Sequence, residues 1–205
     1  MIQLEVRPIK TFEVEPWLLE KHYAKRLPMI QYAFGLYVNN ILSGVVTYGI
    51  PASNNLCEGI CGKEFKEYVI ELNRLCLMNN EPNQSSFLVA NSIKMLPQPS
   101  IIVSYADTAQ GHVGYVYQAT NFIFTGTTKE RTDMFAGEGK HSRHATDPLI
   151  RQFRSAKHRY VFIHGNKKHK KLLKNKLNYP VLSYPKGNTN KYNSGGSVAI
   201  QELLF

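Results

Sequence analysis

Apolar and polar residues alternate along the first part of the chain with the period of two that is typical of strands. Residues 3–8 follow this pattern and predict an opening strand. Residues 32–38 and 42–48 predict two further strands, and Asn39 and Asn40 between them readily adopt the left-handed conformations of a tight turn. We therefore expect these two strands to form a β-hairpin.

The segments on either side of this hairpin lack the strand pattern. Apolar residues recur at helical spacing over residues 13–26, where Pro16 lies near the first turn and Pro28 follows the end. Residues 51–66 are rich in Gly, Asn and Cys. We expect a helix in the first segment and, in the second, a loop with at most a short helical turn.

A strand, a polar turn and a helix are predicted next. Residues 69–78 have the apolar character of a strand, and residues 79–84 are polar. Ser85 or Ser86 is expected to act as the N-cap of a helix over residues 87–95, because serine side chains accept hydrogen bonds from the free N–H groups of a helix start.

Candidate chemistry is concentrated between residues 100 and 126, SIIVSYADTAQGHVGYVYQATNFIFTG. An apolar strand there ends in Ser104, Tyr105 and Asp107, so a hydroxyl, a phenol and a carboxylate arrive together where the chain leaves the sheet. A polar turn, a short amphipathic stretch and a second strand follow. The end of a strand that leads into a loop is a common place for a functional site.

The last third of the chain is strongly basic. Residues 127–159 carry many charges and few apolar residues, and we expect them to form an ordered, functional basic insertion with a short helix near residues 147–153. The elements expected after it are a strand at 160–164, a helix at 167–177, a last strand at 179–183 and a flexible Gly- and Asn-rich stretch at 187–197. With no internal repeat, we expect one α/β (α+β) domain over residues 1–205.

Composition narrows the classes of partner. The 205 residues are 43% hydrophobic, enough for a single domain that buries roughly 70% of its unfolded surface. Twenty-five Lys and Arg residues against fifteen Asp and Glu residues give a formal charge of +10, which favours a polyanionic partner such as nucleic acid.

Compartment is indicated by three features. No apolar run approaches the roughly 18 residues of a membrane span, and the N-terminus lacks the apolar core of a signal peptide. The cysteines Cys57, Cys61 and Cys76 are odd in number, which argues against a disulfide framework. We expect a cytoplasmic protein with free thiols.

The end of the central segment resembles a known enzyme fold. Tyr117 precedes Phe122 by five residues and a strand follows at once, which resembles the A-x-x-x-Y-x-x-x-G-F ending of the Gcn5-related N-acetyltransferases, with Asn121 in place of the usual glycine. This resemblance implies a mixed, splayed central sheet flanked by helices, with the tyrosine as general acid. From spacing alone, Tyr117 and Phe122 are equally consistent with ordinary core aromatics.

A closer resemblance is to the Mom family of phage DNA-modification proteins, a divergent branch of that fold. It rests on HYAKRLP at residues 22–28, on residues 104–126 and on the basic C-terminal third, and it runs from about residue 10 to 185. The resemblance implies an enzyme that converts adenine in DNA to an N6-carbamoylmethyl (acetamido) adenine and so protects phage DNA from restriction. It also implies the cytoplasm of an infected or lysogenic bacterial host.

The same resemblance implies a set of catalytic residues. His22 would be a proton acceptor or metal ligand, Tyr23 a base-stacking or hydrogen-bonding group, Ser104 and Asp107 orienting residues, and Tyr117 the acid. From the sequence alone, His22 is more simply a histidine satisfied at a helix end. His22 and Tyr23 occupy adjacent helical positions, so we expect their side chains to point in different directions.

The donor site is expected at the junction of strand 69–78 with the following helix. In the acetyltransferase fold this junction holds the coenzyme pyrophosphate against helix N–H groups, but the R-x-x-G-x-G/A signature is absent here. The expected donor is acetyl-CoA or another activated two-carbon donor. The candidate cofactor-binding residues are Asn83, Gln84, Ser85 and Ser86.

The implied product carries a nitrogen–methylene bond, which ordinary acetyl transfer does not make. A redox metal such as iron, with His22 and Asp107 as ligands, is one route to it. Adenine N6 is also a poor nucleophile that is paired and stacked in a duplex. The enzyme therefore has to flip the base, accept a proton from N6 and hold the donor against it.

The expected partner is double-stranded DNA, with no membrane, and a homodimer is compatible with the sequence. Lysines of the segment GNKKHKKLLKNKL and several arginines before it would follow phosphates and make binding sensitive to salt, although such charges also occur on ordinary solvated helix faces. The candidate nucleic-acid-binding residues are Lys140, Arg143, Arg151, Lys167, Lys168, Lys170, Lys171 and Lys174.

Two other classes stay open at this point. One is an acyl-CoA-dependent N-acetyltransferase acting on a small amine or a protein lysine, against which the missing phosphate-loop signature counts. The other is a non-catalytic, basic nucleic-acid-binding protein, in which His22, Asp107 and Tyr117 would be packing residues.

Overall fold

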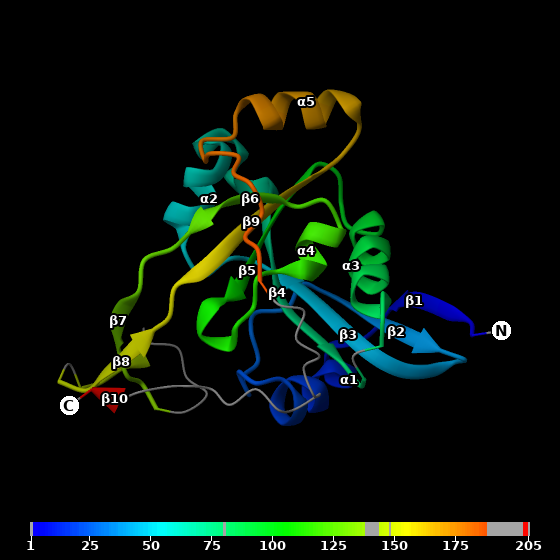
Figure 1. The fold of residues 1–205 in the computed structure, drawn as a ribbon, viewed down its shortest axis with the longest axis horizontal. Helices are drawn as coiled ribbons and strands as arrows, with labels where there is room; N and C mark the ends of the chain where they lie inside the picture. Colours follow the sequence, from blue (N-terminus) through cyan, green and yellow to red (C-terminus); the bar gives the residue numbers. More distant parts are fainter. Residues whose placement is uncertain (1, 80, 138–143, 148, 188–202, 205) are drawn as a thin grey trace.

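A computed structural model describes residues 2–79, 81–137, 144–147, 149–187 and 203–204 of the chain. Its centre is a seven-stranded sheet in the order β1-β2-β3-β4-β5-β9-β6 (Figure 1). All neighbouring strands are antiparallel except β4 and β5, which are parallel. The strands are β1 Leu4–Pro8, β2 Tyr32–Val38, β3 Ile41–Gly49, β4 Val69–Leu77, β5 Ser100–Asp107, β6 Ile123–Thr127 and β9 Lys157–His164.

Helices cover both faces of this sheet. The helical elements are α1 Thr11–Pro16, the π-helix η1 Trp17–Lys21, α2 Asn54–Cys61, the 3-10 helix η2 Lys63–Tyr68, α3 Gln84–Lys94, the 3-10 turn η3 Thr108–Gln110, α4 Tyr115–Ala119 and α5 Lys167–Asn175. Residues of α3 and α4 pack with Leu72 and Ile102 in one core cluster. On the opposite face, α1 and η1 pack on β2 and β3, while α2 and α5 pack on β4, β5 and β9.

The predicted hairpin is confirmed, with Asn39 and Asn40 at φ of 49° and 64° between β2 and β3. The predicted helix at residues 13–26 is shorter than expected. It begins at Thr11, widens into the π-helical turn η1 and ends at Lys21, because His22 adopts an extended conformation with ψ of 133°. The segment HYAKRLP therefore leaves the helix as irregular chain.

Residues 51–66 are not the loop that we predicted. The Ser53 side chain accepts a hydrogen bond from the Leu56 N–H at 3.2 Å and starts α2. Cys57, Ile60 and Cys61 form the buried face of that helix, so the cysteines act as small apolar residues in the core. The glycines and asparagines of this segment concealed the helical spacing.

The basic insertion is built differently from the prediction. Residues 147–153 contain no helix among the described positions; instead β8, Arg151–Arg154, pairs with β7, Arg131–Met134, and with β10, Leu203–Leu204, in a second sheet. The strand expected at 160–164 begins three residues earlier, at Lys157. The strand expected at 179–183 is reduced to a single bridge between Phe124 and Leu182. Of the stretch expected to be flexible, residues 188–197 lie outside the described part.

Candidate active site

The central sheet opens between its two parallel strands. Three residue pairs, from Val69 with Ile101 to Glu71 with Val103, form the register of β4 and β5, and no pair follows them. The Ser104 hydroxyl then donates a hydrogen bond to the Leu72 carbonyl at 2.9 Å. This side-chain bond closes the ladder, and beyond it the two strands diverge. The splay predicted from the family resemblance is therefore present.

A bulge at Asn73 sets the direction of the side chains on the diverging part of β4. The register with β3 shifts there, so that Thr47 lies opposite Arg74 and Tyr48 opposite Leu72. The Asn73 side chain is held by the Thr47 hydroxyl at 2.6 Å and donates to the Met29 carbonyl at 3.0 Å. Leu72 consequently faces α3 and α4, whereas Arg74 shares the α1 face with Cys76, two residues further along the strand.

Tyr117 approaches the opening from the α4 side. It is buried, with ring centroids 5.4 Å from Phe122 and 5.2 Å from Tyr160, so the ring is a core residue as the simpler interpretation held. The Ser104 side chain favours the ionised form, but burial dominates and raises the pKa of Tyr117 well above its ordinary value. The Ser104 hydroxyl donates to the Leu72 carbonyl, and the phenol of Tyr117 stays protonated next to this closing point of the ladder.

His22 and Tyr23 approach the opening from the opposite face of the sheet. The rings of His22 and Tyr23 stack at 4.5 Å with 27° between their planes, and Tyr23 meets His112 edge-on at 6.0 Å. Our expectation that the two side chains point apart is wrong, because the chain leaves the helix at His22 and turns the second ring back over the first. Burial raises the pKa of Tyr23, and the charges of Asp107 and Arg74 act on it in opposite directions.

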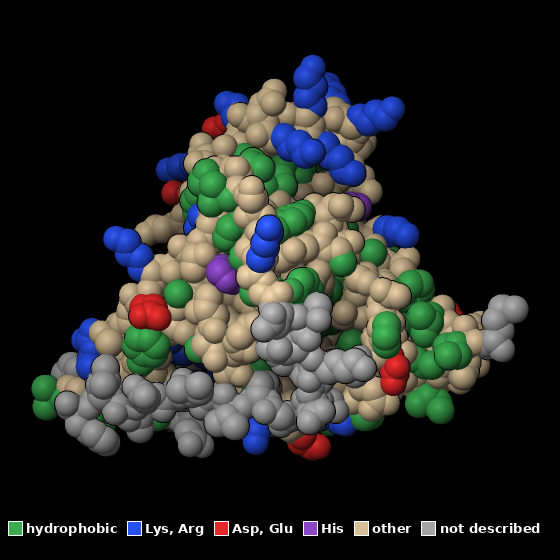
Figure 2. All heavy atoms as spheres, viewed as in Figure 1, with side chains coloured by type: hydrophobic (Ala, Val, Ile, Leu, Met, Phe, Trp, Pro, Cys, Tyr) green, Lys and Arg blue, Asp and Glu red, His purple; other side chains and the backbone are tan. Residues whose placement is uncertain are grey.

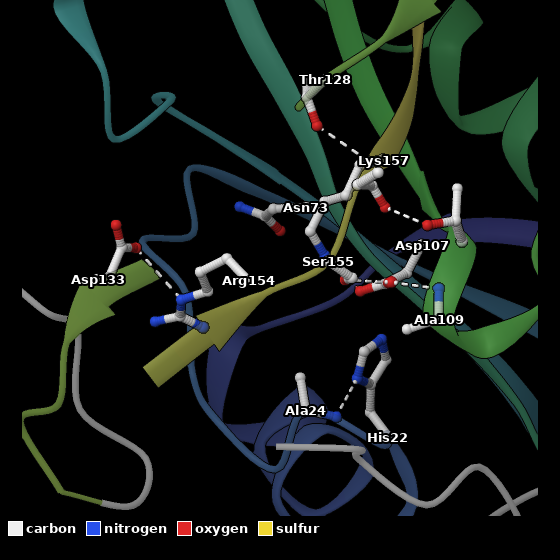
Figure 3. Close-up of polar contacts among 12 residues, drawn as sticks. His22, Ala24, Asn73, Asp107, Ala109, Thr128, Asp133, Arg154, Ser155 and Lys157 are labelled. Atoms are coloured by element: carbon white, nitrogen blue, oxygen red, sulfur yellow. Dashed lines mark hydrogen bonds and ion pairs between the residues drawn. The ribbon is translucent and has the colours of Figure 1, made fainter. Parts of the chain in front are cut away.

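His22 is buried and locked in one orientation. Its Nδ1 accepts a hydrogen bond from the Ala24 N–H at 3.1 Å (Figure 3). Burial, with the nearby charges of Arg74 and His112, lowers the pKa of His22 to about 3. The ring is therefore neutral at physiological pH and carries its proton on Nε2. In this orientation His22 offers a hydrogen-bond donor rather than a proton acceptor.

Asp107 is held by three donors at the C-terminal end of β5 (Figure 3). The Lys157 Nζ lies 2.5 Å from one carboxylate oxygen, and the other oxygen accepts from the Ser155 hydroxyl at 2.6 Å and the Ala109 N–H at 3.1 Å. Burial opposes ionisation, but these contacts prevail and lower the pKa of Asp107. Asp107 is therefore an ionised, positioned group, and its partner Lys157 is not free to contact phosphate.

Glu71 and Arg74 are ionisable residues of this region that the sequence analysis missed. Both lie on β4 next to the opening. Burial raises the pKa of Glu71 despite the positive charges of Arg74, Lys157 and Arg26. Burial likewise lowers the pKa of Arg74, and the charge of Arg26 adds to this effect. The sequence did contain a signal for them, because they are two charged residues within the largely apolar strand at residues 69–77.

The expected donor junction lies at the start of α3, on the same face as Tyr117. The helix begins at Gln84 and its N-cap is Asn83 in the left-handed conformation, with φ of 64°, not Ser85 or Ser86. No side chain caps the helix, and the Ser86 hydroxyl turns instead to the Asn83 carbonyl at 3.0 Å. Asn83 thus adopts the conformation that glycine usually supplies, and an uncapped helix start fits a phosphate-bearing donor.

The candidate DNA-binding residues are divided between the two ends of the molecule. The five lysines of α5 are exposed, and Figure 2 shows their side chains gathered over that helix. In the register of β5 with β9, His164 lies opposite Ser100 and Lys157 opposite Asp107, so α5 follows the end of β9 remote from the site. Arg151, on β8, lies toward the end that carries Asp107. Lys140 and Arg143 lie outside the described residues.

The proposed iron ligands do not form a metal centre in the described part of the chain. There, no three residues among His, Cys, Asp and Glu are grouped so that they could hold a metal ion. Asp107 is committed to Lys157, Ser155 and Ala109, and the Nδ1 of His22 accepts from Ala24. The residues present therefore do not fit the predicted iron site. Within the described residues, no helix is both long and apolar enough to cross a membrane.

The splayed sheet is that of the Gcn5-related N-acetyltransferases, and a solved acetyltransferase structure shares this fold. A putative acetyltransferase from Acinetobacter baylyi is 12% identical and superposes with a TM-score of 0.51, covering 82% of this chain and 96% of that one. An acetyltransferase of the GNAT family from Bacillus cereus is 10% identical, with a TM-score of 0.47, covering 80% and 99%. At 12% identity, the superposition with the Acinetobacter baylyi structure shows a shared fold and nothing further.

Residues 3–186 match the model of the Mom protein family, and the chain belongs to that family. A curated relative, the methylcarbamoylase Mom of Escherichia phage Mu, is 28% identical over 145 residues. The match covers 68% of this chain and 60% of the relative, so the chain spans less than two thirds of that protein. The family predicted from the sequence is therefore confirmed.

Proposed function

We propose that this protein modifies adenine in DNA at N6, adding a carbamoylmethyl group that protects the DNA from restriction. Membership of the Mom family supports a role in phage DNA modification. The observation that carries the proposal is the meeting of two faces at the splay, with Tyr117 on the α4 side and the stacked His22–Tyr23 pair on the α1 side.

The flipped adenine would enter from the α1 side. An extruded base needs an aromatic surface for stacking and donors for its ring nitrogens. Tyr23 supplies the aromatic ring, and the Nε2–H of His22 supplies a donor. Asp107 and Lys157 neutralise each other next to them and fix the loop that starts at the end of β5.

Proton transfer from N6 requires a base, and the two carboxylates differ in basicity. Asp107 has a lowered pKa because of Lys157 and Ser155, which makes it a weak acceptor. Burial raises the pKa of Glu71, which makes it the stronger base of the two. We assign the acceptor role to Glu71, in place of His22, and the acid role to Tyr117.

The donor would lie on the α3 side, with its phosphates on the N–H groups at Gln84, Ser85 and Ser86. When bound, an acetyl-CoA-type donor would supply the activated two-carbon unit. Acyl transfer from acetyl-CoA itself would leave an amide at N6, so the carbamoylmethyl product requires a donor whose leaving group is on the methylene carbon. The bond from N6 to that carbon would form as the bond from the carbon to the leaving group breaks. The residues of this chain would hold and orient the donor, and Tyr117 would protonate the departing leaving group. Donor and acceptor then meet where β4 and β5 separate.

Expression in bacteria tests the proposal. Plasmid recovered from expressing cells should resist enzymes that cut at adenine-containing sites, and nucleoside mass spectrometry should show an adenosine carrying the added group. Glu71→Gln should abolish this modification, whereas Glu67→Gln, an exposed acid four residues earlier, should not. Unmodified adenine from a soluble, folded protein would instead point to an amine N-acetyltransferase or to a binding protein.

A further inference from the structure

Arg74 presents a free donor edge inside the protein. Its Nη1 donates to the Asn73 carbonyl at 2.6 Å. Its Nε and Nη2 are buried and have no hydrogen-bond partner among the described residues. These two nitrogens form one side of the planar guanidinium, so the unpaired donors are adjacent and parallel. Buried donors left without a partner are costly, and they are commonly explained by a ligand that completes them.

The charges around Arg74 leave a local positive excess. Arg154 is paired with Asp133 at 3.2 Å, and Lys157 is paired with Asp107. Arg26 makes no ion pair within the described part of the chain, and its pKa is lowered by burial and then by the charge of Arg154. Among the described residues, Arg26 and Arg74 therefore share the single charge of Glu71, which leaves one positive charge uncompensated there.

We propose that Arg74, assisted by Arg26, binds one phosphate group on the α1 side of the splay. The parallel N–H groups of a guanidinium side match two oxygens of a phosphate, and one anion balances the excess charge. The inference rests on the proposed function for its source: a phosphodiester of DNA, next to a base stacked on Tyr23. A phosphate of the donor has the same chemistry, although the uncapped α3 start lies on the opposite face.

Inorganic phosphate tests the site without any reaction. Phosphate should raise the melting temperature of the wild-type protein above that in chloride of equal ionic strength. Arg74→Gln should lose this increase. Arg74→Lys should lose most of it, because an ammonium lacks the two parallel N–H groups of a guanidinium. Arg7→Gln, on the edge strand β1, should keep it. An unchanged increase in Arg74→Gln, or none in the wild type, overturns the proposal.

Two binding measurements distinguish the sources of the phosphate. With an adenine-containing single strand, Arg74→Gln should reduce the salt dependence of binding by about 0.7 in log–log slope, which corresponds to one phosphate that the variant no longer neutralises. Its affinity for coenzyme A should stay at the wild-type value. Loss of coenzyme A affinity with an unaltered DNA slope would overturn the DNA assignment. The two proposals can also fail separately. If phosphate stabilises the protein through Arg74 but plasmid adenine is unmodified, the phosphate site is supported and only the proposed function is rejected.

Discussion

Lys157 Nζ lies 2.5 Å from an Asp107 carboxylate oxygen, and this ion pair joins the end of β5 to the start of β9. The Asp107 side chain is 11% exposed and that of Lys157 is 36% exposed, so water screens the ammonium more than the carboxylate. The pair is therefore both a structural clamp at the site and a source of pH dependence.

Asp107→Asn should lower the free energy of unfolding by about 1–3 kcal/mol, because it leaves Lys157 without its partner. The folded pKa of Asp107 is lowered, so the carboxylate stabilises the protein above its unfolded pKa and loses that effect as pH falls through the folded value. Urea unfolding of both proteins should show a difference at pH 7 that vanishes in acid. Asp133→Asn, at a more exposed acid, should cost less; an equal cost would contradict the clamp.

Tyr117→Phe keeps the ring contacts with Phe122 and Tyr160 and removes the phenolic hydroxyl on which Ser104 acts. If this hydroxyl is the acid, adenine modification should fall by about 10²-fold or more while the protein stays folded. The matched control is Tyr48→Phe, which removes the hydroxyl of another buried tyrosine, 2.7 Å from Ser92. Modification at the wild-type rate by Tyr117→Phe, measured by nucleoside analysis, would reject the assignment.

Protonation of His22 should destabilise the fold. The pKa of His22 is about 3 in the folded protein against an ordinary 6.5, so the proton binds the unfolded chain preferentially between these values. Stability present above pH 6.5 should therefore decrease as pH falls, by up to about 1.4 kcal/mol per pH unit for this group. His22→Gln should show a shallower decrease in melting temperature from pH 7 to 5. Burial also lowers the pKa values of His112, His158 and His164, so these residues act in the same direction and their contribution remains in the variant.

The lysines of α5 should affect DNA affinity and leave the chemical step unchanged. Replacing Lys167, Lys170 and Lys174 with Gln should weaken duplex binding and reduce its salt slope by about 0.9 for each phosphate that these lysines neutralise in the wild type. At saturating DNA, the modification rate should equal that of the wild type, because these residues lie at the end of β9 remote from Asp107. A fall in that rate, or an unaltered salt slope, would contradict this division of roles.

The sequence predicted the sheet well where the pattern was local. The hairpin, β4 and β5 follow from alternation and from turn residues such as Asn39 and Asn40. It failed at α2, where burial of Cys57, Ile60 and Cys61 against the sheet decides the structure. It failed again at residues 147–153, where pairing with β7 overrides a charged sequence. Contacts distant in sequence determine both outcomes.

The candidate site also contains residues that a local pattern indicated and residues whose role depends on contacts distant in sequence. Ser104, Asp107 and Tyr117 were recognisable because they occupy one continuous segment of the chain. The stack of His22 on Tyr23 depends on a helix ending early, which no local pattern indicated. Glu71 and Arg74 acquire their significance from the divergence of β4 and β5, which is a property of the sheet as a whole.

Strand β9 sets the distance between the candidate site, at the Asp107 end of the strand, and the lysines of α5, which follow its other end. Its register with β5 spans the eight residues from Ser100 to Asp107, about 23 Å of extended chain. A duplex advances this distance in about seven base pairs. An adenine at the splay would therefore need a flanking duplex of at least that length to reach the α5 lysines, and oligonucleotides shorter than this would serve as substrates without the electrostatic contribution of α5.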